Sequence, residues 1–236
     1  MSNLTIKLFA DGADINSIIK LYHSTQIDGI TTNPTLMKKA GISDYEVFAK
    51  DVSSRITDIP LSFEVISDDF IDMERQARKI GSWGENVFIK IPVLNTKGES
   101  SAPLIKKLSG DGFKLNITAI LTIEQVETVL NALNTESAAF VSVFAGRIAD
   151  TGIDPCPIMK QTAIMCGERS KKILSLWAST RELYNIFQAQ ECGVDIITVT
   201  HDILGKLSMI GRDLTDLSLD TVKMFSNDAI SAGFSL

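Results

Sequence analysis

Short apolar runs alternate with amphipathic stretches from one end of the chain to the other. The apolar runs have the length and the β-branched and aromatic content of buried strands. Eight such runs occur, at 6–10, 29–32, 61–65, 87–91, 114–118, 140–144, 173–177 and 196–199. The stretches between them carry apolar residues at helical spacing, so the pattern predicts a repeated strand–helix unit.

Helices are expected between the strands. One begins at Asp14, which can cap a segment with apolar residues at helical spacing. The segments 43–46 and 122–125 match the pattern of a capping box. Further helices are expected at 69–80, 102–109, 157–169, 181–192 and 203–207, and an additional helix at about 218–230 follows the eighth strand.

The alternation of eight strand–helix units in 236 residues predicts a (β/α)8 TIM barrel with an additional C-terminal helix. No linker or low-complexity stretch interrupts the chain, so we expect a single domain over residues 1–236. An open doubly wound sheet is the alternative fold. The glycine fingerprint of a dinucleotide site is missing after the first strand, and no Walker A sequence occurs.

The composition is that of an acidic globular protein. Hydrophobic residues make up 44% of the chain, and the net charge is −6, which argues against nucleic acid or an anionic membrane as partner. No apolar run could span a bilayer, and the first residues lack a signal-peptide pattern, so we expect a cytoplasmic location. The three cysteines and two histidines have no paired spacing, so neither a disulfide nor a His/Cys metal site is predicted. The spacing of histidines and cysteines does not decide whether carboxylates form a metal site.

A lysine interrupts one of the most apolar strands. Lys90 lies within the run V-F-I-K-I-P at 87–92, although lysine is rarely buried. Burial favours the uncharged amine, which attacks carbonyl carbons and forms a Schiff base. The alternative is an edge strand from which the ammonium reaches solvent. This strand alone does not decide between the two interpretations.

Polar residues at the ends of other strands favour the first interpretation. The active site of a barrel lies at the carboxyl ends of its strands, and alternate side chains of a strand share a face. By this parity Glu64, Lys90, Asn116 and Thr118 point into the barrel, and the apolar residues between them point toward the helices. The other polar residues that end or follow strands are Asp11, Asn33, Ser142, Ser179 and Arg181.

Each of these signals is weak by itself. Asp11 fits a turn or helix cap, and Asn33 before a proline fits a turn opener. Their joint occurrence at successive strand ends is what indicates a site. Residues that also fit ordinary structural, strand or surface positions are Glu64, Thr118, Ser142 and Arg147.

Four segments together resemble the transaldolase family, in its short-chain branch. They are T-T-N-P-T at 31–35, F-I-K-I-P at 88–92, L-N-I-T at 115–118 and F-A-G-R-I at 144–148. The resemblance implies a (β/α)8 barrel and a Schiff-base transfer of a dihydroxyacetone unit. The donor would be a ketose phosphate (sedoheptulose 7-phosphate or fructose 6-phosphate). The acceptor would be an aldose phosphate (glyceraldehyde 3-phosphate or erythrose 4-phosphate), as in the non-oxidative pentose phosphate pathway.

The resemblance also implies a role for each site residue. Lys90 would be the nucleophile, Asp11 the general acid and base, and Glu64 with Thr118 would hold a water for imine formation. No metal or organic cofactor is implied, and the implied partners are sugar phosphates and other copies of the chain in a pentamer or decamer. The residues expected to bind substrate are Asn33, Asn116, Ser142, Phe144, Arg147, Ser179 and Arg181.

Two other functions are considered. Fructose 6-phosphate aldolase, a close relative in the same branch, carries glutamine at the position of Glu64 and tyrosine at that of Phe144, so both positions favour transaldolase here. A non-catalytic sugar-phosphate-binding barrel is the alternative of another class, since fold alone does not fix function. The full set of Asp11, Glu64, Lys90 and Thr118 argues against it.

Overall fold

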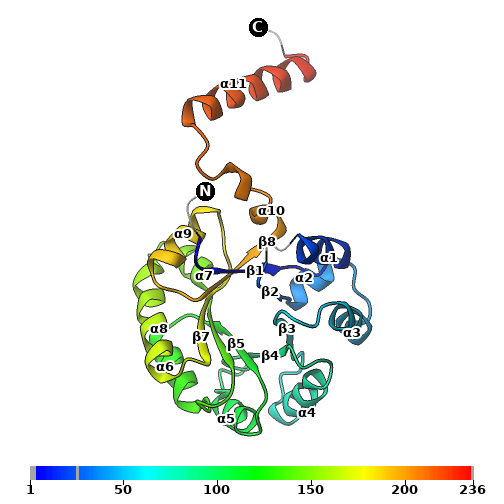
Figure 1. The fold of residues 1–236 in the computed structure, drawn as a ribbon, viewed down its shortest axis with the longest axis vertical. Coiled ribbons are helices and arrows are strands. Elements are labelled where there is room, and N and C mark those ends of the chain that lie inside the picture. The colour runs from blue at the N-terminus through cyan, green and yellow to red at the C-terminus, as the bar shows by residue number, and fades with distance from the viewer. Residues whose placement is uncertain (1–3, 25–26, 235–236) are drawn as a thin grey trace.

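The computed structural model describes residues 4–24 and 27–234, which form a closed barrel of eight parallel strands (Figure 1). The strands pair in sequence order, and β8 returns to pair with β1. The predicted (β/α)8 fold is confirmed, and the open-sheet alternative is wrong. The strands are β1 (Lys7–Asp11), β2 (Gly29–Thr31), β3 (Leu61–Glu64), β4 (Val87–Pro92), β5 (Leu115–Ile120), β6 (Ala139–Val143), β7 (Ile173–Trp177) and β8 (Ile196–Thr200).

Helices surround the barrel in Figure 1. Two short ones, α2 and α7, were not predicted, because six and five residues are too few to show a helical period. None of the helices in the described part of the chain is long and apolar enough to cross a membrane. The helices are α1 (Ile15–His23), α2 (Pro34–Lys39), α3 (Tyr45–Arg55), α4 (Phe70–Gly81), α5 (Ala102–Gly110), α6 (Ile123–Ala132), α7 (Ala145–Ala149), α8 (Cys156–Arg169), α9 (Tyr184–Glu191), α10 (His201–Leu204) and α11 (Leu214–Ser231).

Side-chain caps begin several of these helices. Asp14 caps α1 as predicted, and Thr122 and Gln125 form a reciprocal capping box at 3.3 Å and 3.2 Å. The predicted box starting at Ser43 is wrong by one residue. Asp44 has the extended backbone of the cap, and its carboxylate accepts a backbone N–H of α3 at 3.0 Å.

Two helices start three or four residues from the predicted position. The side chain of Asn185 accepts the N–H groups of Arg181 and Glu182 at 2.9 Å and 3.1 Å. These bonds hold 181–183 outside regular α-helix, so α9 begins at Tyr184 rather than at 181. The C-terminal helix α11 begins at Leu214 rather than at 218, because Asp213 caps it there.

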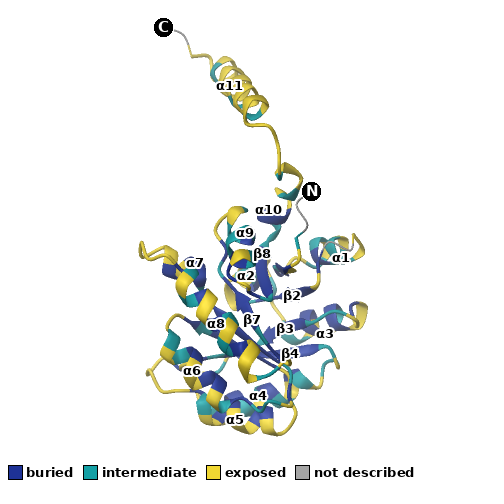
Figure 2. Ribbon diagram, turned by 60° about the vertical axis from the view of Figure 1, so that its left-hand side comes forward, coloured by how far each residue is buried: buried dark blue, intermediate teal, exposed yellow. Residues whose placement is uncertain are grey.

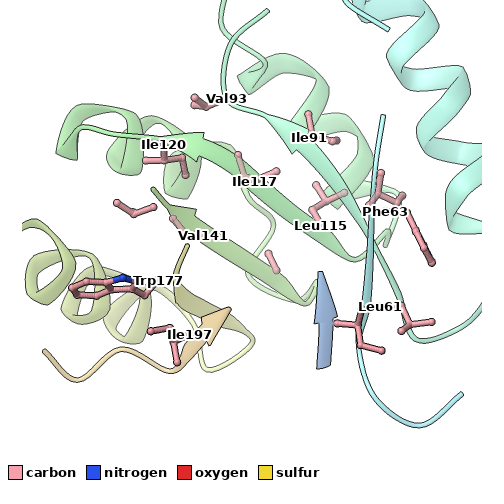
Figure 3. Close-up of a cluster of buried hydrophobic side chains, with 14 of the residues drawn as sticks. Leu61, Phe63, Ile91, Val93, Leu115, Ile117, Ile120, Val141, Trp177 and Ile197 are labelled. Carbon is pink, nitrogen blue, oxygen red and sulfur yellow. The ribbon is translucent and has the colours of Figure 1, made fainter. Parts of the chain in front are cut away.

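The main core lies between the barrel and its helices, as the buried bands in Figure 2 indicate. Outward-facing side chains of neighbouring strands meet in this layer, among them Phe63, Ile91 and Ile117 (Figure 3). Phe63, Ile91 and Ile117 are each at most 1% exposed. These are the residues that strand parity assigned to the helix side, so burial of this layer fixes which residues turn inward.

A separate aromatic layer fills the inside of the barrel. The rings of Phe88 and Phe140 stack with centroids 4.0 Å apart, and Phe9 meets Phe140 edge to face at 5.6 Å. A Cβ at Gly29 would lie 2.5 Å from the Phe9 ring, so glycine makes room for this ring. Each phenylalanine precedes by two positions, on the same strand face, a polar residue of the predicted site: Asp11, Lys90 and Ser142.

The C-terminal helix is separate from both layers. Figures 1 and 2 show α11 extending away from the barrel, and none of its residues is buried. Its apolar side chains Leu219, Val222 and Phe225 are 52%, 61% and 62% exposed. The single domain over residues 1–236 stays a prediction, because no side chain of α11 is buried against the barrel.

We predict that Phe140→Ala destabilises the protein by about 3–5 kcal/mol, since it empties the centre of the aromatic layer. Urea denaturation followed by circular dichroism measures this change. Ile71→Ala on α4 is the matched control, because Ile71 is 83% exposed and its truncation should change the free energy of unfolding by less than about 0.5 kcal/mol. Equal effects of the two substitutions would contradict the prediction.

Candidate active site

A cavity of about 380 Å³ lies at the carboxyl ends of the strands. All the residues singled out from the sequence line it, although they come from seven strands or the loops after them. Of the helices in the described chain, only α2 and α7 contribute, through their first turns. The lining includes Asp11, Asn33, Glu64, Lys90, Asn116, Thr118, Ser142, Phe144, Arg147, Ser179 and Arg181.

Lys90 lines this cavity and is 6% exposed. Its Nζ lies 3.1 Å from Oε2 of Glu64 and donates to the carbonyl oxygen of Thr32 at 3.1 Å. Strand β4 pairs with β3 on one side and β5 on the other, so the edge-strand interpretation of Lys90 is wrong. A buried amine beside a carboxylate can exchange a proton without solvent.

Asp11 faces the same cavity from β1. Burial raises the pKa of its carboxyl group, and the positive charge of Lys90 and a hydrogen bond from Thr31 at 2.9 Å lower it. The charge of Glu64 adds to the rise, and His201 opposes it. A carboxyl group whose pKa is raised above its ordinary value is better suited to both accept and donate a proton.

Three polar side chains form a buried chain across β3, β5 and β6. The hydroxyl of Ser142 donates to Oδ1 of Asn116 at 2.6 Å, and Nδ2 of Asn116 donates to the hydroxyl of Ser62 at 3.0 Å. These bonds fix the amide orientation and leave one amide N–H of Asn116 for a ligand.

Thr118 is the next inward residue along β5. Its Oγ1 is buried and has no hydrogen-bond partner among the described residues. An unpaired buried hydroxyl at a cavity wall provides a binding point for a ligand oxygen or a water.

Asn33 combines a structural and a ligand-facing position. Its Oδ1 accepts the N–H of Leu36 at 3.0 Å and so caps α2, in agreement with the turn interpretation. Asn33 also lines the cavity, and its amide NH2 has no partner within the described chain. The cap therefore orients the amide donors that a substrate hydroxyl could meet.

Two arginines line the outer part of the cavity. The guanidinium of Arg147, on α7, lies 5.6 Å from the ring centroid of Phe144. Arg181 is held by Asp150, with its Nε and Nη2 at 2.9 Å and 2.5 Å from the two carboxylate oxygens. This pair is about half exposed, so its net contribution to stability is small, and its effect is to orient Arg181.

Close packing positions the loop that carries Arg181. A Cβ at Gly146 would lie 1.6 Å from the carbonyl oxygen of Ser179, so only glycine allows α7 to approach this loop. Ser179 itself has a left-handed backbone with φ of 65°. The two arginines thus reach one side of the cavity from α7 and from the loop after β7.

Sequence reasoning gave no role to three buried threonines of the cavity wall, Thr31, Thr180 and Thr198. Thr31 and Thr198 line the cavity and contact each other through their hydroxyls at 2.5 Å. Strand parity contained a signal for Thr31, because it lies two positions before the predicted site residue Asn33. Among the described residues, no cluster of three or more His, Cys, Asp or Glu is arranged to hold a metal ion.

Comparison with known proteins is consistent with this arrangement. Residues 8–236 match the family model described as transaldolase/fructose-6-phosphate aldolase. A probable transaldolase of Dehalococcoides mccartyi is 33% identical, over 89% of this chain and 93% of the relative. A probable transaldolase of Methanococcus maripaludis is 35% identical over the same shares, and one of Bdellovibrio bacteriovorus is 32% identical over 94% and 97%. With the barrel and the match over residues 8–236 together, the chain belongs to the transaldolase/fructose-6-phosphate aldolase family.

Proposed function

We propose that this enzyme is a transaldolase that moves a dihydroxyacetone unit from a ketose phosphate to an aldose phosphate. The observation that carries the proposal is the buried Lys90, with Glu64 at 3.1 Å and Asp11 on the wall of the same cavity. The names of the relatives support the same activity.

The first half of the reaction forms and uses an imine. Lys90 attacks the ketone carbon of the donor, and loss of water gives a protonated imine. Glu64 and Thr118 are proposed to hold the water that leaves and later returns. Asp11 takes the proton of the C4 hydroxyl, the C3–C4 bond breaks, and the aldose product departs. The imine draws in the electron pair of that bond, which leaves a three-carbon enamine on Lys90.

The second half reverses these steps with the acceptor. The enamine carbon attacks the aldehyde of the incoming aldose phosphate, and Asp11 returns its proton to the new hydroxyl. Water then hydrolyses the imine. Asn33, Asn116 and Ser142 are proposed to bind the hydroxyls of the three-carbon unit, since they offer amide and hydroxyl groups next to Lys90.

The arginines are proposed to bind the phosphate. Guanidinium groups keep their charge and present a planar fork of donors. Arg147 and Arg181 lie at the cavity side where Ser179 adds a hydroxyl. A phosphate bound there leaves the reactive end of an extended sugar to reach Lys90.

The setting of the reaction belongs to the same proposal. Sugar phosphates are cytoplasmic metabolites, and the exchange corresponds to the non-oxidative pentose phosphate pathway. A homo-oligomer, a pentamer or decamer by family resemblance, is supported by the exposed apolar face of α11. Burial of that face against a second copy would remove it from water.

We predict that Lys90→Ala abolishes transfer from fructose 6-phosphate to erythrose 4-phosphate, since no other lysine of the described chain lines the cavity. Borohydride reduction in the presence of donor should leave a three-carbon adduct on Lys90, detected by peptide mass mapping. Lys7→Ala is the matched control, because Lys7 also points into the barrel but lines a cavity at its opposite end. An adduct elsewhere, or transfer by Lys90→Ala, would overturn the proposal.

The alternative activity is cleavage of fructose 6-phosphate to free dihydroxyacetone. We predict that Phe144→Tyr raises this activity severalfold, because a phenol at the cavity wall can deliver a proton to the enamine. The rate of dihydroxyacetone release without acceptor measures it, and Phe144→Leu controls for loss of the ring. Fast release by the unsubstituted enzyme would instead make aldolase its main activity.

We predict that Val222→Asp with Phe225→Asp dissociates the oligomer, because both substitutions put charge on the apolar face of α11. Light scattering coupled to size exclusion gives the mass. The barrel should stay folded, since α11 contributes no buried side chain. Ile164→Asp on α8, at a site 53% exposed, is the control and should keep the native mass. A monomeric unsubstituted chain would refute the oligomer.

A further inference from the structure

A chain of two hydroxyls leads to the carboxylate of Asp11. Thr31 on β2 donates to Oδ1 of Asp11 at 2.9 Å, and the hydroxyl oxygens of Thr31 and Thr198 lie 2.5 Å apart. Both threonines are buried, at 3% and 5% exposure. The chain crosses the inside of the barrel from β8 to β2 and back to β1.

The direction of this chain follows from the number of hydrogens. A threonine hydroxyl carries one hydrogen, and an ionised carboxylate only accepts. Because Thr31 donates its hydrogen to Asp11, its oxygen must accept from Thr198. Thr198 thus donates to Thr31, and Thr31 donates to Asp11.

The second oxygen of Asp11 has a different environment. Oδ2 has no hydrogen-bond partner within the described residues, whereas Oδ1 is bound by Thr31. Asp11 lines the cavity, so its two carboxylate oxygens can have different roles. One anchors the carboxylate to the barrel, and the other can take or give a proton.

We propose that Thr31 and Thr198 are positioning residues that hold Asp11 by one oxygen and keep it a competent base for carbon–carbon bond cleavage. The inference rests on the proposed function, in which Asp11 takes the proton of the donor hydroxyl. It goes beyond that function by assigning the orientation and basicity of Asp11 to two hydroxyls that do not themselves react.

Within the described chain, Thr31 is the one side chain that donates a hydrogen bond to Asp11, and several charged groups act on it as well. The charged and titratable groups that affect Asp11 are Lys90 from β4, Glu64 from β3 and His201 from α10. None of the three forms a hydrogen bond to the carboxylate in the described structure. The bond from Thr31 lowers the pKa of Asp11 against the rise that burial causes.

A second bond holds the strand that carries Thr198. The hydroxyl of Thr180 donates to the backbone carbonyl of Thr198 at 2.7 Å. This contact fixes β8 at the point where it faces β2 across β1, so the hydroxyl of Thr198 stays within hydrogen-bond distance of Thr31. The chain is therefore part of the rigid barrel and not of a loop.

The test is the pH dependence of kcat for transfer in Thr31→Val, which has nearly the same shape but no hydroxyl. We expect kcat to fall about 10- to 100-fold, the range for loss of one hydrogen bond to a charged group. The acidic limb of the kcat profile should move to higher pH. Without the bond from Thr31 the pKa of Asp11 rises further, so a higher pH is needed to ionise the base. KM for the donor should change little in Thr31→Val. Thr31→Ser keeps a hydroxyl and should restore the native pH profile of kcat. Thr198→Val should shift the acidic limb less than Thr31→Val does.

Thr162→Val is the matched control for the loss of a buried threonine hydroxyl. Thr162 is fully buried on α8, and among the described residues its hydroxyl bonds only to the carbonyl of Ile158, at 2.8 Å. This variant should keep the native acidic limb. A Thr31→Val enzyme that loses stability but keeps the native limb would overturn the proposal, as would failure of Thr31→Ser to restore it.

The failure of this inference differs from that of the proposed function. Borohydride trapping of donor on Lys90 does not require Asp11, so Thr31→Val should still give the adduct. If the unsubstituted enzyme neither transfers nor forms an adduct, the proposed function fails. If it does both and Thr31→Val has an unchanged pH profile, only the threonine chain is refuted.

Discussion

The pairing of β8 with β1 is the constraint on which the rest of the structure depends. Closure turns one face of every strand inward, away from bulk water and away from the helices. A side chain on that face must then pack against other rings or find polar partners among its neighbours. The inside of this barrel does both, in two layers. Phe9, Phe88 and Phe140 fill the lower one, and polar residues two positions further along the same strands form the upper one.

The upper layer is stable because nearly every buried polar group in it has a partner. Lys90 is paired with Glu64, Asn116 lies between two serines, and Asp11 is held by Thr31. Removing one partner of such a pair leaves the other buried and unpaired, which is more destabilising than the pair is stabilising. The exception is Thr118, whose buried hydroxyl is unpaired within the described chain. This unpaired hydroxyl lies on β5, the strand that pairs with the one carrying Lys90.

In the outer part of the site, side chains are oriented by contacts at the surface rather than by burial. Arg147 and Arg181 are partly exposed and are oriented by a ring and by a carboxylate rather than by burial. Their placement relies on the close approach of α7 to the loop after β7, which Gly146 permits. A rigid interior and a more open rim suit a reaction whose two aldose phosphates must enter and leave while the three-carbon unit stays bound.

The sequence by itself determined the alternation of strands and helices and, through strand parity, which residues face inward. These features are local, because they depend on spacing along one strand. The starts of α3 and α11 were beyond it because single aspartate caps decide them, and the start of α9 because Asn185 binds the residues before it. The helices α2 and α7 were beyond it because they are too short to show a helical period. Only the tertiary structure decided that β4 has no free edge, that Glu64 reaches Lys90, and that Thr198 reaches Thr31. Those contacts join residues distant in sequence, and closure of the barrel, not any local pattern, brings them together.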